Sequence, residues 1–255
     1  MICWVVERAL AACNVSRAIV ATDDGRIMDA VQSAGYEAVM TRRDHQSGTD
    51  RIAEVAASLS DVEYIVNVQG DEPLIAAATI ERAVEAIGGT ENRKGEGAKG
   101  NGEGTSDEKV GIVTTWEPLE SAADVVNPDV VKVVVDEGER AIYFSRLPVP
   151  YPRDAVRAHG SIEAAILAAP ALLTNFRKHT GLYVYRRAVL LAFASWPQTA
   201  LERLESLEQL RALANGVRIK AIRASTPSIG VDTLDDLRRV RKIVEEEACS
   251  LEYKL

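Results

Sequence analysis

Apolar residues along the chain switch between short continuous runs and the three-to-four-residue spacing of a helix face. Residues 17–22, 36–41 and 64–68 are apolar runs of strand length, and residues 49–59 show helical spacing. The run at 64–68 is rich in Ile and Val, which is typical of a strand buried on both faces. This alternation predicts an α/β fold with a mostly parallel central sheet and helices on both faces.

The first apolar pattern of the chain is helical. Ile2, Val5, Val6 and Ala9 fall on one helix face, so a helix is predicted over residues 2–13. An α/β domain more often opens with a strand.

More strands and helices are predicted in the rest of the chain. Residues 130–136 and 140–145 form a hairpin, because an Asp-Glu-Gly turn separates them. A helix is predicted at 201–214, where the leucines at 204, 207 and 210 form the buried stripe. The other predictions are strands at 110–116, 181–186, 217–221 and 229–231, an extended proline-rich connection at 147–152, and helices at 27–33 and 234–247.

Residues 88–108 interrupt this pattern. They are rich in Gly, Glu, Lys and Asn and hold almost nothing apolar, so they cannot form a core. Strand-like sequence resumes directly after them. We therefore predict a single domain over residues 1–255 with a disordered surface loop inserted at 88–108.

The net charge limits the partners of the chain. With 38 acidic and 30 basic residues it carries a charge of −8, and a field of that sign does not attract nucleic acid. An anionic substrate would need local cationic side chains, a helix N-terminus or a bound cation.

Cysteine spacing and hydropathy favour the cytoplasm. Cys3, Cys13 and Cys249 have no metal-ligand spacing and are typical of reduced thiols. No apolar run approaches the roughly 18–20 residues that span a bilayer, and no signal peptide is recognisable. We expect a cytoplasmic protein without a membrane partner.

A short polar stretch follows the strand predicted at 64–68. Residues 67–73 read N-V-Q-G-D-E-P and lie at the carboxyl end of a strand, where parallel sheets bind ligands. Asp71 and Glu72 supply oxygen ligands of the kind that Mg²⁺ prefers. The stretch alone leaves open a metal site and a turn with solvated acids.

A second carboxylate, Asp232, precedes the closing helix. Thr233 and Asp236 predict a capping box at the start of that helix. The cap does not need Asp232, whose carboxylate is left to share one magnesium ion with Asp71, or simply to stabilise the helix dipole.

Residues 41–51 run from a predicted strand into a helix N-terminus. Ser47 and Gly48 expose backbone groups suited to a base edge or an anion. Three arginines in this loop supply local positive charge or form a solvated face. His45 is predicted to be a loop or capping histidine, because no second ligand stands at metal-binding spacing.

Other familiar site patterns are weak or missing. By periodicity alone Glu208 and Gln209 are surface residues of the helix at 201–214. The sequence has no G-x-G-x-x-G after a strand, no Walker A string, no G-x-S-x-G elbow and no H-E-x-x-H.

Seven strings nonetheless stand in one order along nearly the whole chain. They are D-H-Q-S-G-T-D-R (44–51), N-V-Q-G-D-E-P (67–73), N-P-D-V-V-K-V-V (127–134), Y-F-S-R (143–146), H-T-G-L-Y-V-Y (179–185), L-E-Q-L-R (207–211) and G-V-D-T (230–233). In this order the chain resembles the CMP-KDO synthetases (3-deoxy-manno-octulosonate cytidylyltransferases).

The resemblance implies a fold and a reaction. The reaction is CTP + KDO → CMP-KDO + pyrophosphate, with Mg²⁺ as cofactor, in lipopolysaccharide biosynthesis. The fold is a Rossmann-like nucleotidyltransferase sheet with a smaller lobe, within about residues 117–200, for sugar binding and homodimer contact.

The resemblance also implies site residues. Asp71 and Asp232 would hold Mg²⁺, and Gln69 would lie near the reacting centre. The cytosine and ribose pocket would be lined by Ser47, Gly48 and Arg51. The KDO pocket would be lined by Arg146, His179, Tyr183, Glu208 and Gln209, with Arg146 or His179 paired with the sugar's carboxylate.

The chain departs from the family at its start. Family members open with a strand and a P-A-R-x-x-S-x-R-L-P-x-K-x-L loop that binds the triphosphate, whereas Met1 and Ile2 align with the helix after that loop. We therefore expect the first strand to be missing and the 255-residue chain to bind CTP poorly. The alternatives are a start site further upstream, a cytidylyltransferase for another acid sugar such as sialic acid, and a catalytically inactive fragment or binding subunit.

Overall fold

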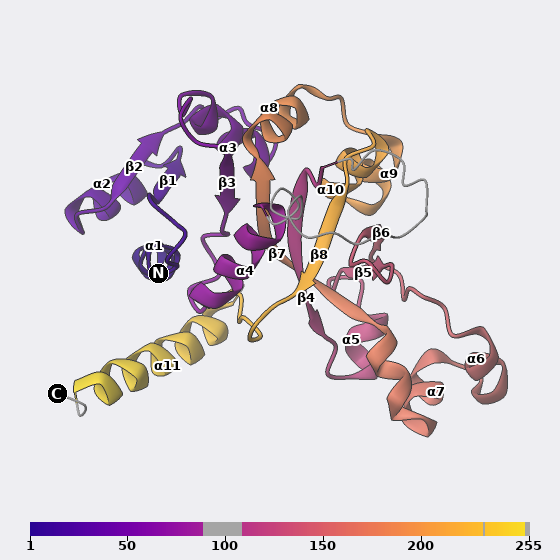
Figure 1. Ribbon diagram of the computed structural model, residues 1–255. Helices are drawn as coiled ribbons and strands as arrows, with labels where there is room; N and C mark the ends of the chain where they lie inside the picture. The colour runs from indigo at the N-terminus through magenta and orange to yellow at the C-terminus, as the bar shows by residue number, and fades with distance from the viewer. Residues whose placement is uncertain (89–108, 232, 253–255) are drawn as a thin grey trace, which may run out of the picture. The chain divides into compact units, whose positions relative to one another are not determined.

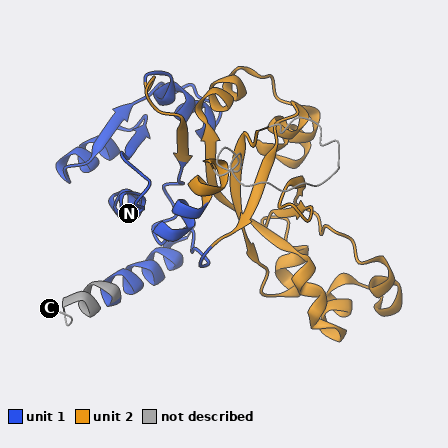
Figure 2. Ribbon diagram, in the orientation of Figure 1, with its two compact units in different colours: residues 1–58, 67–82, 225–255 blue, residues 59–66, 83–224 orange. Residues whose placement is uncertain are grey.

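The computed structural model describes residues 1–88, 109–231 and 233–252 (Figure 1). The insert predicted at 88–108 lies outside the described residues, except for Gly88. The chain divides into two compact units (Figure 2). Unit 1 comprises Met1–Ser58, Asn67–Arg82 and Ser225–Leu255, and unit 2 comprises Leu59–Val66 and Ala83–Ala224.

Unit 1 is built around a parallel pair of strands. Strand β1 (Ile19–Thr22) pairs with β2 (Glu37–Met40), from Ile19 opposite Glu37 to Thr22 opposite Met40. Its helices are α1 (Ile2–Leu10), α2 (Gly25–Ser33), α3 (Gly48–Ala57) and α11 (Leu234–Glu252), and α4 (Ala77–Gly88) begins in it.

The core of unit 1 follows from the sequence pattern. Val6 of α1, Val20 of β1, Val31 of α2 and Ala38 of β2 form one buried cluster. Helix α2 begins where the Asp24 side chain accepts a hydrogen bond from the backbone N–H of Arg26, over 2.8 Å. The helix predicted at 27–33 therefore begins slightly earlier, directly after Asp24.

Unit 2 contains a mixed sheet. Its path runs β6-β5-β7-β4-β8, and β3 also pairs with β7. Strands β4 and β8 are parallel, whereas β4 with β7, β5 with β6 and β5 with β7 are antiparallel. The strands are β3 (Tyr64–Asn67), β4 (Ile112–Pro118), β5 (Lys132–Val135), β6 (Ala141–Ser145), β7 (Arg177–Arg186) and β8 (Ile219–Arg223).

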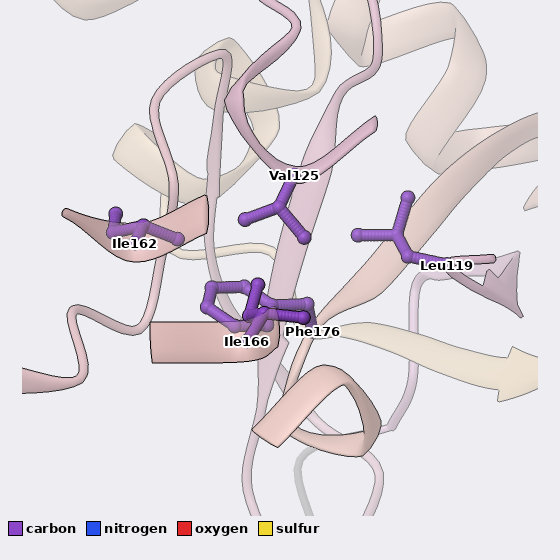
Figure 3. Close-up of a cluster of buried hydrophobic side chains, with 5 residues drawn as sticks. All are labelled: Leu119, Val125, Ile162, Ile166 and Phe176. Atoms are coloured by element: carbon purple, nitrogen blue, oxygen red, sulfur yellow. The ribbon is translucent and has the colours of Figure 1, made fainter. Parts of the chain in front are cut away.

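Short helices connect these strands. A separate apolar cluster of Leu119, Val125, Ile162, Ile166 and Phe176 holds α5, α7 and the start of β7 together (Figure 3). The helices of unit 2 are α5 (Ala122–Val126), α6 (Arg153–His159), α7 (Ile162–Ala168), the 3₁₀ helix η2 (Pro170–Asn175), α8 (Arg187–Ser195), α9 (Ala200–Glu205) and α10 (Gln209–Ala214).

The α/β architecture and the hairpin of β5 and β6 confirm the predictions, whereas the sheet of unit 2 is mixed rather than mostly parallel, because the antiparallel pairings of β7 with β4 and of β5 with β6 accompany the parallel pair of β4 and β8. The single helix predicted at 201–214 is wrong, because Ser206 adopts a left-handed conformation with φ 53° and ends α9. Leu204 is 82% exposed, so it does not belong to the buried stripe. The strand predicted at 229–231 does not form.

A membrane span was not expected from the sequence. Within the described ranges, no helix is long and apolar enough to cross a membrane.

Candidate functional site

The predicted site residues fall into two groups, one in each unit. The first comprises Ser47, Gly48, Arg51, Gln69 and Asp71 in unit 1, and the second comprises Arg146, His179, Tyr183, Glu208 and Gln209 in unit 2.

Ser47 and Gly48 form the start of α3. Ser47 has extended backbone, and its hydroxyl oxygen accepts a hydrogen bond from the N–H of Asp50 over 3.2 Å. Gly48 is exposed, and a Cβ atom built on it would meet nothing within 4 Å. The first turn of α3 therefore presents backbone N–H groups beside open space, which suits an acceptor such as a base edge or an anion.

Arg51 ties this helix start to the ends of both strands of unit 1. Its Nη1 donates to the hydroxyl of Thr41 over 2.6 Å and lies 3.1 Å from the carboxylate of Asp23. Asp23 follows β1 and Thr41 follows β2. Because Asp23 and Thr41 stand at the carboxyl ends of the two strands, the guanidinium of Arg51 lies at the carboxyl edge of the pair. Parallel strands bind ligands at this edge.

The loop between β2 and α3 is anchored on Glu54. The Nε2 atom of His45 is hydrogen-bonded to the Glu54 carboxylate, and the backbone N–H of Arg42 donates to the same oxygen over 3.3 Å. The hydrogen bond with His45 lowers the pKa of Glu54, with smaller contributions from Arg42. His45 is thus a loop-anchoring residue, as predicted.

Asp71 is exposed just after β3, in the stretch that follows Gln69. Its backbone carbonyl accepts a hydrogen bond from the N–H of Val231 over 2.8 Å. The carbonyl of Gln69 accepts from the N–H of Glu72 over 3.2 Å, which closes a turn around Gly70. The two acid-bearing segments predicted to meet are therefore adjacent along their backbones.

Asp232 itself lies outside the described residues. Its neighbour Thr233 begins α11 with the predicted capping box. The Thr233 hydroxyl accepts from the N–H of Asp236 over 3.1 Å, and the Asp236 carboxylate accepts from the N–H of Thr233 over 3.0 Å.

In unit 2, His179 and Tyr183 lie along β7. Their ring centroids are 5.4 Å apart, and the ring of Phe144 meets His179 edge-on at 5.0 Å. Dense packing lowers the pKa of His179 from 6.5 to about 3, because burial disfavours the charged imidazolium. His179 is therefore neutral at neutral pH.

A hydrogen bond to β4 fixes the tautomer of His179. The Nε2 atom lies 2.9 Å from the hydroxyl oxygen of Thr114, and that hydroxyl donates to the carbonyl of Leu182 over 2.8 Å. Because the hydroxyl hydrogen is directed to the carbonyl, Nε2 carries the imidazole hydrogen. The Nδ1 atom is then an acceptor.

Tyr183 lies close to Glu208. Burial raises the pKa of Tyr183, and the nearby charges of Tyr185 and Glu208 raise it further. One carboxylate oxygen of Glu208, Oε2, is buried and has no hydrogen-bond partner among the described residues. Such a buried acceptor normally has a partner, so it is available to a donor from a ligand.

Glu208 and Gln209 begin α10, immediately after the break at Ser206. Gln209 is only 7% exposed. The surface position that periodicity gave these two residues is therefore wrong for Gln209, and the break in the helix explains why.

Arg146 is held by backbone carbonyls. Its Nε donates to the carbonyl of Glu205 over 2.7 Å and its Nη1 to that of Pro128 over 2.9 Å. These bonds leave further N–H groups of the guanidinium for a ligand. The second group therefore gathers one cation, a neutral imidazole, a phenol, a carboxylate and an amide.

The sequence analysis did not identify two residues that contact the second group, Thr114 beside His179 and Lys132 beside Arg146. Thr114 gave no signal, since a threonine inside a strand is ordinary. Lys132 did give one, since it interrupts the apolar string V-V-K-V-V, and the structure shows that it is 0% exposed.

Comparisons with known proteins agree with this architecture. The sequence profile of the cytidylyltransferase family matches residues 1–219. A solved 4-diphosphocytidyl-2C-methyl-D-erythritol synthase from Anaerococcus prevotii shares the fold at 10% identity, with a TM-score of 0.54 over 96% of this chain and 88% of that one. The fold and the family profile define a nucleotidyltransferase.

Relatives with higher sequence identity show which family of nucleotidyltransferases the chain belongs to. The 3-deoxy-manno-octulosonate cytidylyltransferase of Trichlorobacter lovleyi is 45% identical over 96% of this chain and 88% of its own length. That of Pseudomonas syringae is 42% identical over 92% of this chain and 85% of its own length. A solved CMP:2-keto-3-deoxy-manno-octonic acid synthetase complexed with CTP is 36% identical, with a TM-score of 0.78 over 96% of this chain and 88% of that one. The chain belongs to the 3-deoxy-manno-octulosonate cytidylyltransferase family.

Proposed function

We propose that this protein transfers CMP from CTP to KDO, giving CMP-KDO and pyrophosphate, as a step of lipopolysaccharide biosynthesis. The observation that carries the proposal is identity of 45% over 96% of the chain with a relative named for this reaction. The similarity to a synthetase solved with CTP supports the nucleotide.

The reaction is an in-line displacement at phosphorus. The anomeric hydroxyl of KDO loses its proton and its oxygen forms a bond to the α-phosphorus of CTP. The bond from that phosphorus to the oxygen bridging it to the β-phosphate breaks, and pyrophosphate leaves. Catalysis of such transfers consists mainly of positioning and of neutralising charge.

Magnesium fits the chemistry of the residues present. Asp71 offers an exposed carboxylate, and its backbone is bonded to Val231, the residue before Asp232. Mg²⁺ is usually bound through one or two carboxylates together with substrate phosphates, so Asp71 and Asp232 would suffice to hold it. When bound, the ion supplies positive charge to the phosphates and lets an acidic protein accept two anionic substrates.

The remaining residues of unit 1 would bind the nucleoside. The start of α3 at Ser47 and Gly48 would receive the cytosine and ribose through backbone N–H groups. Arg51, fixed by Thr41 and Asp23, would add a cationic wall. Gln69, beside Asp71, would lie near the reacting phosphorus.

The residues of unit 2 would bind the sugar. Arg146 is the better partner for the carboxylate of KDO, because the lowered pKa of His179 removes its charge. The Nδ1 of His179 and the buried Oε2 of Glu208 are acceptors for sugar hydroxyls. Tyr183 and Gln209 would complete this surface. We further propose that the protein works in the cytoplasm as a homodimer.

The test measures pyrophosphate release from CTP by the purified protein with Mg²⁺ and KDO, sialic acid or no sugar. Slow release with KDO, abolished when EDTA removes the metal, is the expected result, in line with the poor CTP binding expected from the sequence. Faster release with sialic acid than with KDO would make another acid sugar the proposed substrate. No release with either sugar would contradict an enzymatic function and favour a binding subunit.

A further inference from the structure

Unit 2 contains a fully buried lysine that the proposed reaction does not use. Lys132, the first residue of β5, is 0% exposed. Its Nζ donates three hydrogen bonds, all to backbone carbonyls: 2.9 Å to Asn127, 2.6 Å to Val130 and 2.6 Å to Arg146. The ammonium hydrogens are thereby satisfied without a carboxylate in hydrogen-bond contact.

The segments held by Lys132 reach the sugar-binding residues of the proposed function. Arg146 is one of them. The carbonyl of Val131, between the Val130 carbonyl and Lys132 itself, accepts from the N–H of His179 over 2.8 Å. Displacement of this turn would therefore move the start of the His179 segment of β7.

Arg146 also bonds the chain at the break between α9 and α10. Its Nε donates to the carbonyl of Glu205, and the Glu205 carboxylate accepts from the N–H of Arg146 over 2.9 Å and from the Ser145 hydroxyl over 2.7 Å. Ser206, which follows, has the unusual φ of 53°. This turn directly precedes Glu208 and Gln209, so its conformation sets where α10 begins.

A lysine in this place is costly for stability. Removing an ammonium from water disfavours the folded state, and a well-packed apolar residue of similar volume is often at least as stabilising. The cost is explained if three backbone segments must be held at one point, because an apolar side chain cannot bond their carbonyls.

We propose that Lys132 is a positioning residue of the sugar site, which fixes the backbone at Arg146 and at residues 127–131 and, through Arg146, the turn at Glu205 and Ser206. The inference rests on the proposed function for the identity of the ligand. The placement of the turn does not depend on it.

The experiment compares wild type with Lys132→Met and Glu205→Gln. Lys132→Met keeps the length of the side chain and removes the charge and all donors. Glu205→Gln keeps the shape of the side chain and removes its charge. It is the variant compared with wild type if Lys132→Met does not fold. The control is Lys220→Met, which removes a lysine of the same unit paired at the surface with Glu139.

Two readouts separate positioning from general stability. We expect the dissociation constant for KDO to rise about 10-fold to 100-fold, because displacement of Arg146 would weaken its charged hydrogen bond to the sugar, with the constant for CTP unchanged. We also expect faster amide hydrogen exchange in residues 200–210, with exchange in residues 19–57 unchanged. The control should match wild type in both.

Equal KDO affinity and equal local exchange in wild type and in the folded variants would overturn the inference. A uniform increase of exchange over both units would overturn it too, since that result describes ordinary destabilisation. Wild-type protein that binds no KDO would instead contradict the proposed function, and faster exchange at 200–210 alone would still support the positioning of the turn.

Discussion

The backbone N–H of Val231 donates to the backbone carbonyl of Asp71 over 2.8 Å, so two segments far apart in the chain lie side by side. One segment follows strand β3 and the other leads into helix α11. A hydrogen bond between backbones is insensitive to the side chains at these positions. Substitution of the Asp71 carboxylate therefore tests its chemistry with little effect on the contact that places it.

Asp71→Asn is expected to lower Mg²⁺-dependent turnover by at least about 100-fold, because the loss even of a hydrogen-bond partner of a metal ligand commonly costs 10-fold to 100-fold. Steady-state pyrophosphate release over a range of Mg²⁺ concentrations measures the effect. Asp29→Asn, at an exposed position of α2, is the control and should match wild type. Near-wild-type turnover of Asp71→Asn would disprove the metal assignment.

Arg146→Ala is expected to raise the KM for KDO about 10-fold to 100-fold, because a hydrogen bond to a charged group contributes about 1.5–3 kcal/mol. The KM for CTP should stay unchanged. Initial rates at varied KDO and saturating CTP provide the measurement. An unchanged KM for KDO would rule out Arg146 as the partner of the sugar's carboxylate.

His179 predicts a pH dependence of stability. Its pKa is about 3 in the folded protein, whereas an unfolded histidine titrates near about 6.5. Between these values the unfolded chain binds a proton that the folded chain does not, so the free energy of unfolding falls as the pH decreases below about 6.5. Above that pH the contribution of His179 is constant.

His179→Gln removes this titration. Between about pH 7 and about pH 5 the variant should lose less stability than wild type, by at most about 1.4 kcal/mol per pH unit. Urea unfolding at both pH values measures the difference. Parallel losses in the two proteins would show that folding does not lower the pKa of His179.

The capping box of α11 predicts a local effect on stability. Thr233→Ala removes the hydroxyl that bonds Asp236, and it should cost about 1 kcal/mol. Thr233→Ser keeps the hydroxyl and should retain most of the stability. Chemical denaturation compares the two variants, and equal values for Ala and Ser would show that the box contributes nothing.

The buried ion pair of Glu202 and Arg211 predicts a larger effect. The two side chains are 4% and 5% exposed, and Arg211 Nε donates to Glu202 over 2.9 Å. Arg211→Met should destabilise the protein by about 3–5 kcal/mol, because it leaves a buried charge without its partner. The double variant with Glu202→Gln should recover part of the loss.

An exposed pair serves as the control for that prediction. Asp235 and Arg238 are 87% and 75% exposed, and Arg238→Met should cost no more than about 1 kcal/mol. Thermal unfolding of the three variants gives the ranking. A loss in Arg211→Met as small as in the control would contradict a stabilising role for the buried pair.

The sequence predicted most elements that carry strong local signals. The strands at 17–22, 36–41 and 64–68 stand where β-branched residues cluster, and the capping box at Thr233 follows from adjacent residues. The break at Ser206 could not be predicted, because the leucine spacing continues through it. The conformation there depends on carbonyls held by Arg146, which is distant in sequence.

The candidate site was predicted by motif order rather than by periodicity. Periodicity placed Gln209 on the surface, but it is buried, and gave no role to Lys132, whose three partners come from tertiary structure. The hydrogen bond from Val231 to Asp71 is also a tertiary contact. Residues 229–231, which the sequence predicted as a strand, form this single contact and no strand.

The division of the chain in Figure 2 has a consequence for biosynthesis. Unit 1 draws on Met1–Ser58, on Asn67–Arg82 and on Ser225–Leu255, so its last stretch leaves the ribosome after the whole of unit 2. A nascent chain closes distant contacts more slowly than local ones, and incomplete domains expose apolar surface. The hydrogen bonds of Asp71 with Val231 and of Thr79 with Ser225 can therefore form only after the whole of unit 2 has been synthesised, so the segment that carries Asp71 gains these contacts late.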